Sequence, residues 1–171
     1  MKSDILSFIE EKQKLLQDMV FEDQTDCRIT TGIALPLMLV NKILTEKKEK
    51  IFVGKYALTS SEFEVLISLL ALNKRLTPTE LYENMIFSSG GMTKILNKLE
   101  SKKLIKRVDS QQDKRSRFVE ITPKGVQLAK AAFKEAIAFH VKVFDVLDED
   151  EKIFLEKILK KMFLAIMSAD V

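Results

Sequence analysis

One segment, residues 76–122, most constrains the fold of this 171-residue chain. In its middle, apolar side chains recur three and four positions apart, so a helix is expected to begin near Ser88 and Ser89. These apolar positions are Met92, Ile95, Leu96 and Leu99. At about 100° per residue, the opposite face is polar and cationic. That outer face carries Gly90, Lys94, Asn97 and Ser101, with Thr93 and Lys98 flanking them.

Patterns on both sides of this helix predict a larger unit. Upstream, Thr77-Pro78-Thr79-Glu80 combines a capping box with a proline in the first turn, so a short helix is expected to begin there. Only residues 86–88 would separate the two helices, as in a helix-turn-helix. Downstream, residues 104–108 and 117–121 alternate apolar and polar side chains and predict a two-stranded hairpin. Helix, turn, helix and hairpin in this order predict a winged helix.

Positive charge is concentrated in the same segment. Residues 88–119 contain nine lysines and arginines against three acidic residues, whereas the net charge of the whole chain is only +3. Such a local excess of cations predicts a surface that binds a polyanion. Contacts to DNA phosphates are expected from Lys98, Lys102, Lys106 and Arg117. Base edges would be read by Ser89, Thr93, Lys94 and Asn97.

Two adjacent glycines stand near the expected start of the basic helix. Each lowers helix stability by about 1 kcal/mol relative to alanine, so their presence needs a reason. Gly90 is expected to point outward, where a missing side chain would let the backbone approach DNA closely. For Gly91, close packing against another helix explains the residue equally well.

Apolar side chains also dominate both ends of the chain. They predict helices over residues 4–21, 33–48 and 123–145, and a last helix that follows an acidic cap at residues 148–151. The helix over 33–48 is apolar on nearly all sides as far as Val40, so it is expected to be deeply buried. The C-terminal helices carry more apolar surface than one subunit can cover, so a homodimer is expected.

The expected architecture is mainly α with a small β-hairpin. Only five glycines and three prolines occur, which favours helices. The sequence predicts a winged helix-turn-helix flanked by N- and C-terminal helical dimerisation regions. Its parts would be an N-terminal extension (1–31), a linking and dimerisation helix (32–57), a DNA-binding lobe (58–122) and C-terminal dimerisation helices (123–171).

From Leu58 onward the sequence resembles the MarR family of winged-helix transcriptional regulators. The resemblance lies in LTSSEFEVL, SSGGMTKILNKLESKKLIKR and DKRSRFVEITPKG. It implies a homodimer that binds a pseudo-palindromic operator in double-stranded DNA, with a recognition helix in each major groove. The Asp-x-Arg of the wing would be Asp113, Lys114 and Arg115, with Arg115 in the adjacent minor groove. The resemblance also implies repression, relieved by a small aromatic or anionic effector or by cysteine oxidation.

The chain departs from that family at the end of the basic helix. Family members usually have glycine before the first wing strand, and this chain has Lys103. Lys103 must therefore take the left-handed conformation at some cost, or the helix must end differently.

Other functions remain as alternatives. A winged-helix dimer could act as an adaptor that binds another protein instead of DNA. An enzyme is not expected, because the chain has one histidine, His140, in an apolar segment, and no phosphate-binding glycine loop. No metal or other cofactor is expected, since one histidine and one cysteine cannot build a Cys/His zinc site. Cys27, the lone thiol, is a candidate oxidant sensor.

No membrane role is expected. The longest apolar run, residues 33–40, is too short to cross a bilayer, and no signal peptide opens the chain. A single cysteine also fits a reducing compartment, so a cytoplasmic location is expected.

Overall fold

The computed structural model divides into two compact units, residues 1–55 and 56–171, which are considered separately. The structure describes residues 7, 8, 10–12, 14, 15, 29–72, 75–85, 91–109 and 117–168. Several residues with an expected role lie outside this described part. These are Cys27, Ser88, Ser89, Gly90, Asp113, Lys114 and Arg115.

In the first unit, a five-residue π-helical turn, η1 (Thr30–Ala34), leads into the long helix α3 (Leu35–Tyr56). Pro36 lies in the first turn of α3, as the sequence predicts, although η1 runs directly into α3 before it. A proline has no N–H, so Pro36 donates no hydrogen bond back to η1. The expected deep burial is wrong for the single chain. Side chains of this segment are 44% to 69% exposed: Ile33, Leu37, Met38 and Val40. An all-round apolar surface needs partners on all sides, and one chain covers only part of it.

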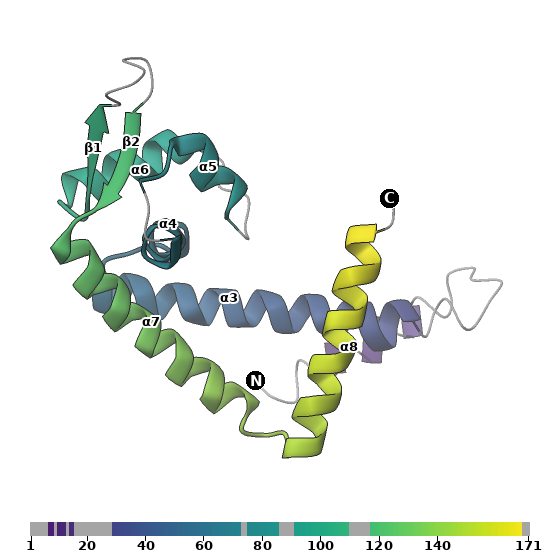
Figure 1. Cartoon of the computed structure of the whole chain (residues 1–171). Helices are drawn as coiled ribbons and strands as arrows, with labels where there is room; N and C mark the ends of the chain where they lie inside the picture. The colour runs from purple at the N-terminus through teal and green to yellow at the C-terminus, as the bar shows by residue number, and fades with distance from the viewer. Residues whose placement is uncertain are drawn as a thin grey trace. The chain divides into compact units, whose positions relative to one another are not determined.

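The second unit contains the winged helix, and it confirms the predicted fold class (Figure 1). Its elements are α4 (Ser60–Leu72), α5 (Pro78–Glu83), α6 (Met92–Ser101), β1 (Ile105–Asp109), β2 (Arg117–Ile121), α7 (Pro123–Phe144) and α8 (Glu149–Ser168). Helix α4 contacts α5, α6, α7 and β2, so it is the centre of this lobe. The core between these elements is formed mainly by Leu66, Leu69, Leu81, Leu96, Leu99, Leu104 and Val119.

Side-chain hydrogen bonds cap the beginnings of four helices in this unit, α4, α5, α7 and α8. Thr77 and Glu80 form a capping box at α5, with Pro78 at the first helical position. Thr59 and Glu62 exchange the same pair of bonds at α4, at 3.2 and 2.8 Å. Asp148 and Glu151 do so at α8, and Thr122 accepts a hydrogen bond from the Gly125 amide at α7. These caps satisfy amides that have no partner within their own helix.

The hairpin also follows the prediction, within one residue. β1 and β2 are antiparallel, with Ile105 opposite Ile121 and Asp109 opposite Arg117. Leu76, just before α5, adds a bridge to the other edge of β2 through two backbone hydrogen bonds with Val119. The hairpin is therefore tied to the entrance of the helix-turn-helix as well as to α6.

The start of α6 differs from the prediction. Gly91 is the N-cap and has φ of 97°, so α6 begins at Met92 and not near Ser88 and Ser89. Neither close helix packing nor DNA approach is required to explain Gly91, since an added Cβ would meet only the Lys94 Cβ, at 3.8 Å. Its positive φ gives the reason, because only glycine adopts that conformation without strain. Helix α5 ends at Glu83, so the gap between the two helices exceeds the three residues expected.

The end of α6 confirms the expectation for Lys103. Its φ is 61°, the left-handed conformation, which costs a non-glycine residue roughly 1–2 kcal/mol. The Lys103 amide donates to the Glu100 carbonyl at 2.8 Å, and the Leu104 amide donates to the Leu99 carbonyl at 2.9 Å. This is a Schellman motif, in which Leu99 and Leu104 also pack together in the core.

Gly125 in the first turn of α7 should tolerate no side chain. A Cβ there would collide with the Leu104 carbonyl oxygen and would lie 2.8 Å from the Ile121 Cγ1. We expect Gly125→Ala to lower the free energy of unfolding by roughly 2–4 kcal/mol, measured by urea denaturation. Gly54→Ala in α3 is the matched control, because its Cβ would meet nothing within 4 Å, and should be neutral or slightly stabilising. Equal stability of the two variants would contradict this packing.

Candidate nucleic-acid interface

The outer face of α6 is polar and exposed, as the sequence predicts. Its inner side chains Leu96 and Leu99 are buried in the lobe, and Met92 and Ile95 pack against the same core. The opposite face carries Thr93, Lys94, Asn97, Lys98 and Ser101, all exposed. Lys94 and Lys98 form no ion pair with any residue that the structure describes, so their ammonium groups are available to an anion.

Arg107 contributes to this surface, although the sequence reasoning missed it. From β1 its guanidinium donates to the Asn97 Oδ1 and to the Glu100 Oε2, each at 2.7 Å. Asn97 and Glu100 are three positions apart and so lie on one side of α6. The sequence contains a signal for this inward position. Arg107 comes two residues after the buried Ile105, so its side chain lies on the same, inward face of the strand.

Lys102 differs from its expected role as a phosphate contact. Its ammonium donates to both carboxylate oxygens of Glu62, at 2.7 and 2.8 Å, and to the Ala57 carbonyl at 2.7 Å. The Glu62 side chain is only 1% exposed and that of Lys102 is 34% exposed, so the pair is buried on the glutamate side. Three partners use the three hydrogen atoms of the ammonium, which leaves none for DNA. Lys102 instead ties the end of α6 to the beginning of α4.

The cations of the hairpin are also paired, but near the surface. Glu120 on β2 forms ion pairs with Lys106 on β1, at 2.7 Å, and with Arg75 before α5. Arg117 donates to Asp109 across the hairpin at 3.2 Å. Exposed pairs of this kind contribute little to stability and can exchange their partner for a phosphate. Lys106 and Arg117 therefore remain predicted contacts.

A family comparison decides what kind of protein presents this surface. Residues 47–132, half of the chain, match the model of a family described as transcriptional regulator SarA/Rot. The chain belongs to this SarA/Rot family. It is similar to the HTH-type transcriptional regulator MhqR of Bacillus subtilis, with 31% identity over 112 residues, which are 66% of this chain and 77% of that protein. The family and this relative are both described as transcriptional regulators.

Solved structures place this SarA/Rot member among MarR-type winged helices. The reduced form of MarR from Escherichia coli is 25% identical, with a TM-score of 0.65 over 76% of this chain and 95% of that one. A DNA complex of MepR from Staphylococcus aureus is 21% identical, with a TM-score of 0.68 over 78% and 97%. The resemblance seen in the sequence is thus confirmed.

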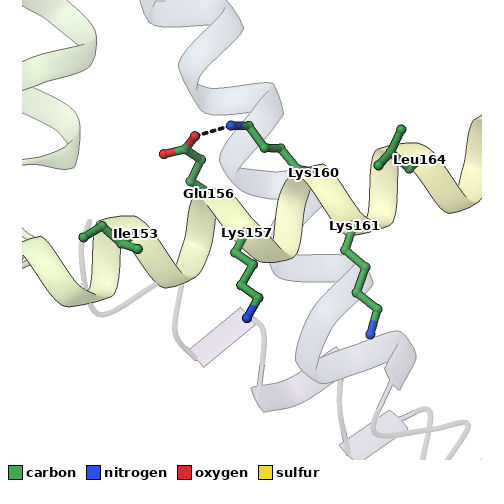
Figure 2. Close-up of a pocket in the computed structure, with 6 residues that line it drawn as sticks. All are labelled: Ile153, Glu156, Lys157, Lys160, Lys161 and Leu164. Atoms are coloured by element: carbon green, nitrogen blue, oxygen red, sulfur yellow. Dashed lines mark hydrogen bonds and ion pairs between the residues drawn. The ribbon is translucent and has the colours of Figure 1, made fainter.

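The C-terminal helix of this SarA/Rot member presents a different surface. None of the residues of α8 is buried, and large apolar side chains along it are exposed, including Phe154, Phe163 and Ile166. Figure 2 shows a shallow pocket on this helix, where Glu156 pairs with Lys160 while Lys157 and Lys161 extend together to another side. In the described residues no helix is long and apolar enough to cross a membrane.

His140 on α7 is exposed in the single chain, so it is not a core residue of that chain. Its ring lies 5.6 Å from the Phe139 ring. The apolar segment around it predicts a position in the core or at a subunit interface, and of these the subunit interface stays a prediction.

The Glu120 cluster should give the fold a pH dependence. The hydrogen bond from Lys106, with the nearby charge of Arg75, holds the pKa of Glu120 below its ordinary value of 4.5. The stabilisation is therefore complete above pH 4.5 and is lost as the pH falls through the lowered pKa. We expect Glu120→Gln to cost at most about 1 kcal/mol at pH 7, because the pairs are near the surface. In an acid denaturation series the difference from the wild type should shrink as the pH falls below 4.5, and a constant difference would contradict the ion pairs.

Proposed function

We propose that this chain is a homodimeric, sequence-specific DNA-binding regulator of transcription. The observation that carries the proposal is the exposed basic face of α6, where Thr93, Lys94, Asn97 and Lys98 stand on a helix that is anchored by its opposite face. A single α-helix fits the major groove of B-DNA, and side chains on its outer face then reach base edges. The membership of the SarA/Rot family supports the same activity.

In this proposal the residues divide into two roles. Lys98, Lys106 and Arg117 would contact phosphates, which gives affinity without reading the sequence. Ser89, Thr93, Lys94 and Asn97 would meet base edges, with Ser88, Gly90 and Gly91 near the start of the helix close to the DNA backbone. Lysine suits the guanine O6 and N7 acceptors. Lys102 is not included among the contacts, because Glu62 and Ala57 already bind its ammonium.

The wing would add a second contact. Asp113, Lys114 and Arg115 follow the Asp-x-Arg pattern of the MarR family, and Arg115 would enter the minor groove beside the recognition helix. Narrow A·T-rich grooves have the more negative potential and attract arginine, so the operator should be A·T-rich there. The ion pair of Arg117 with Asp109 lies at the base of this tip.

A second copy of the chain would complete the binding unit. Exposed apolar side chains recur on α3, α7 and α8, which is more apolar surface than a monomer ordinarily leaves in water. Residues 32–57 and 123–171 would form the dimer, and residues 58–122 the DNA-binding lobe. Two-fold symmetry then requires a pseudo-palindromic operator, with half-sites roughly 34–36 Å apart. Repression relieved by a small aromatic or anionic effector is the action that the MarR resemblance implies.

Two substitutions separate base reading from groove binding. Lys94→Ala and Arg115→Ala should each weaken operator binding, by roughly 5- to 100-fold for a good contact. Only Lys94→Ala should change which operator variants are preferred. Fluorescence titrations across a panel of operator variants, repeated at raised salt, measure both effects. Lys130→Ala on α7 is the control for loss of one positive charge, and unchanged affinity for both test variants would favour the protein-binding adaptor.

The dimer can be tested on α8 without disturbing the lobe. Phe163 is 64% exposed in the single chain, so Phe163→Glu should leave the fold of each subunit intact. Placing a charge in an apolar subunit interface should convert the dimer to a monomer and weaken operator binding. Sedimentation equilibrium gives the mass, and circular dichroism checks the helical content. A wild-type protein that is monomeric at micromolar concentration would refute the homodimer.

A further inference from the structure

The contact between Arg107 and Asn97 has a consequence for base reading. An arginine side chain has only hydrogen-bond donors, so the Asn97 atom 2.7 Å from its Nη2 must be the carbonyl oxygen Oδ1. The amide is therefore turned with its oxygen toward β1 and its Nδ2 group away from Arg107. Asn97 is exposed, so these N–H donors can reach a molecule that lies against α6.

Glu100 fixes the arginine that makes this contact. The second arm of the Arg107 guanidinium donates to the Glu100 Oε2 at 2.7 Å, so the planar group is held at both ends by α6. The Arg107 side chain is 26% exposed, and its charge is balanced by Glu100. A guanidinium with two fixed partners on a rigid helix is preorganised, because its fork cannot turn without breaking both bonds.

We propose that Arg107 is a positioning residue that restricts Asn97 to the role of a hydrogen-bond donor and thereby selects guanine at one base pair. This inference rests on the proposed function. Guanine presents two acceptors, N7 and O6, in the major groove, which suit the N–H groups of Asn97. Adenine presents one acceptor and one donor, so its bidentate pairing with asparagine also needs the amide oxygen. In this protein the bond from Arg107 turns that oxygen toward β1 and uses one of its two lone pairs, so the amide cannot turn its oxygen to a base without breaking a charge-assisted bond.

The preference is reversed if the arginine is removed. A free Asn97 amide can turn and offer its oxygen and its nitrogen together, which is the arrangement that reads adenine. Arg107→Met keeps an unbranched side chain of similar reach but has no donor. Arg107→Lys keeps the charge but cannot hold Asn97 and Glu100 with a planar fork, so its effect should be intermediate.

Selection from a random library of DNA duplexes tests the inference with the full-length protein. The wild type should enrich guanine at one position of each half-site, and Arg107→Met should change the guanine-to-adenine ratio there by about tenfold in favour of adenine. Asn97→Ala should lose the preference at this position, and Arg107→Met added to Asn97→Ala should change nothing further. Lys98→Ala is the matched control, since it should lower affinity but leave the enriched sequence unchanged.

A readout without DNA keeps the two proposals apart. In nuclear magnetic resonance spectra of the free protein, Arg107→Met should shift the side-chain NH₂ signals of Asn97, while thermal unfolding checks that the fold is kept. Identical enriched sequences for wild type and Arg107→Met, with an intact fold, would overturn the inference but leave DNA binding standing. A wild-type protein that enriches no sequence would overturn the proposed function itself.

Discussion

The backbone of Leu104 holds α6, the hairpin and α7 together. Its amide donates to Leu99 and so ends α6, while its carbonyl accepts hydrogen bonds from the Thr122 amide at 3.0 Å and the Thr122 hydroxyl at 3.1 Å. Thr122 in turn caps α7 through Gly125, which approaches the same carbonyl closely. Because the Leu104 side chain is also buried, the position of α6 relative to the hairpin is set at a point that water does not reach. The outer face of α6 is therefore presented on a rigid support.

Ion pairs within the lobe decide how much of its positive charge faces a ligand. Lys102 is used internally by Glu62, and Arg107 is balanced by Glu100. Lys94 and Lys98 remain on the outer face, with Lys106 and Arg117 in exchangeable pairs on the hairpin. The count of basic residues along the sequence thus overstates the charge available to a phosphate backbone. Lys102 and Arg107 have a different use, since Lys102 ties the end of α6 to α4 and Arg107 holds the side chains of Asn97 and Glu100.

Local patterns predicted much of this architecture because the forces behind them are local. Thr77 and Glu80 cap α5 within one turn of backbone, and the alternation in β1 and β2 follows from the pleat. The predicted start of α6 was wrong by several residues because a glycine can stand inside a helix, at some cost, as well as at a left-handed cap. Which one it takes depends on the path of the chain before it. The left-handed conformation of Lys103 could be predicted, because a Schellman motif needs a left-handed residue at this position whatever its type.

The sequence by itself determined the elements of the lobe, the inner and outer faces of α6, and the family resemblance. Only the tertiary structure decided which cations are free, because Lys102 and Glu62 are 40 residues apart and meet only after α4 and α6 have packed. The same holds for Arg107 and Asn97, which lie on different elements. The tertiary structure also decided that apolar side chains of α3 are exposed, because burial depends on the surfaces that the rest of the chain supplies. Hydrophobic periodicity can be read from the order of the residues alone. A specific contact between two polar atoms within 3 Å depends instead on how distant segments are brought together.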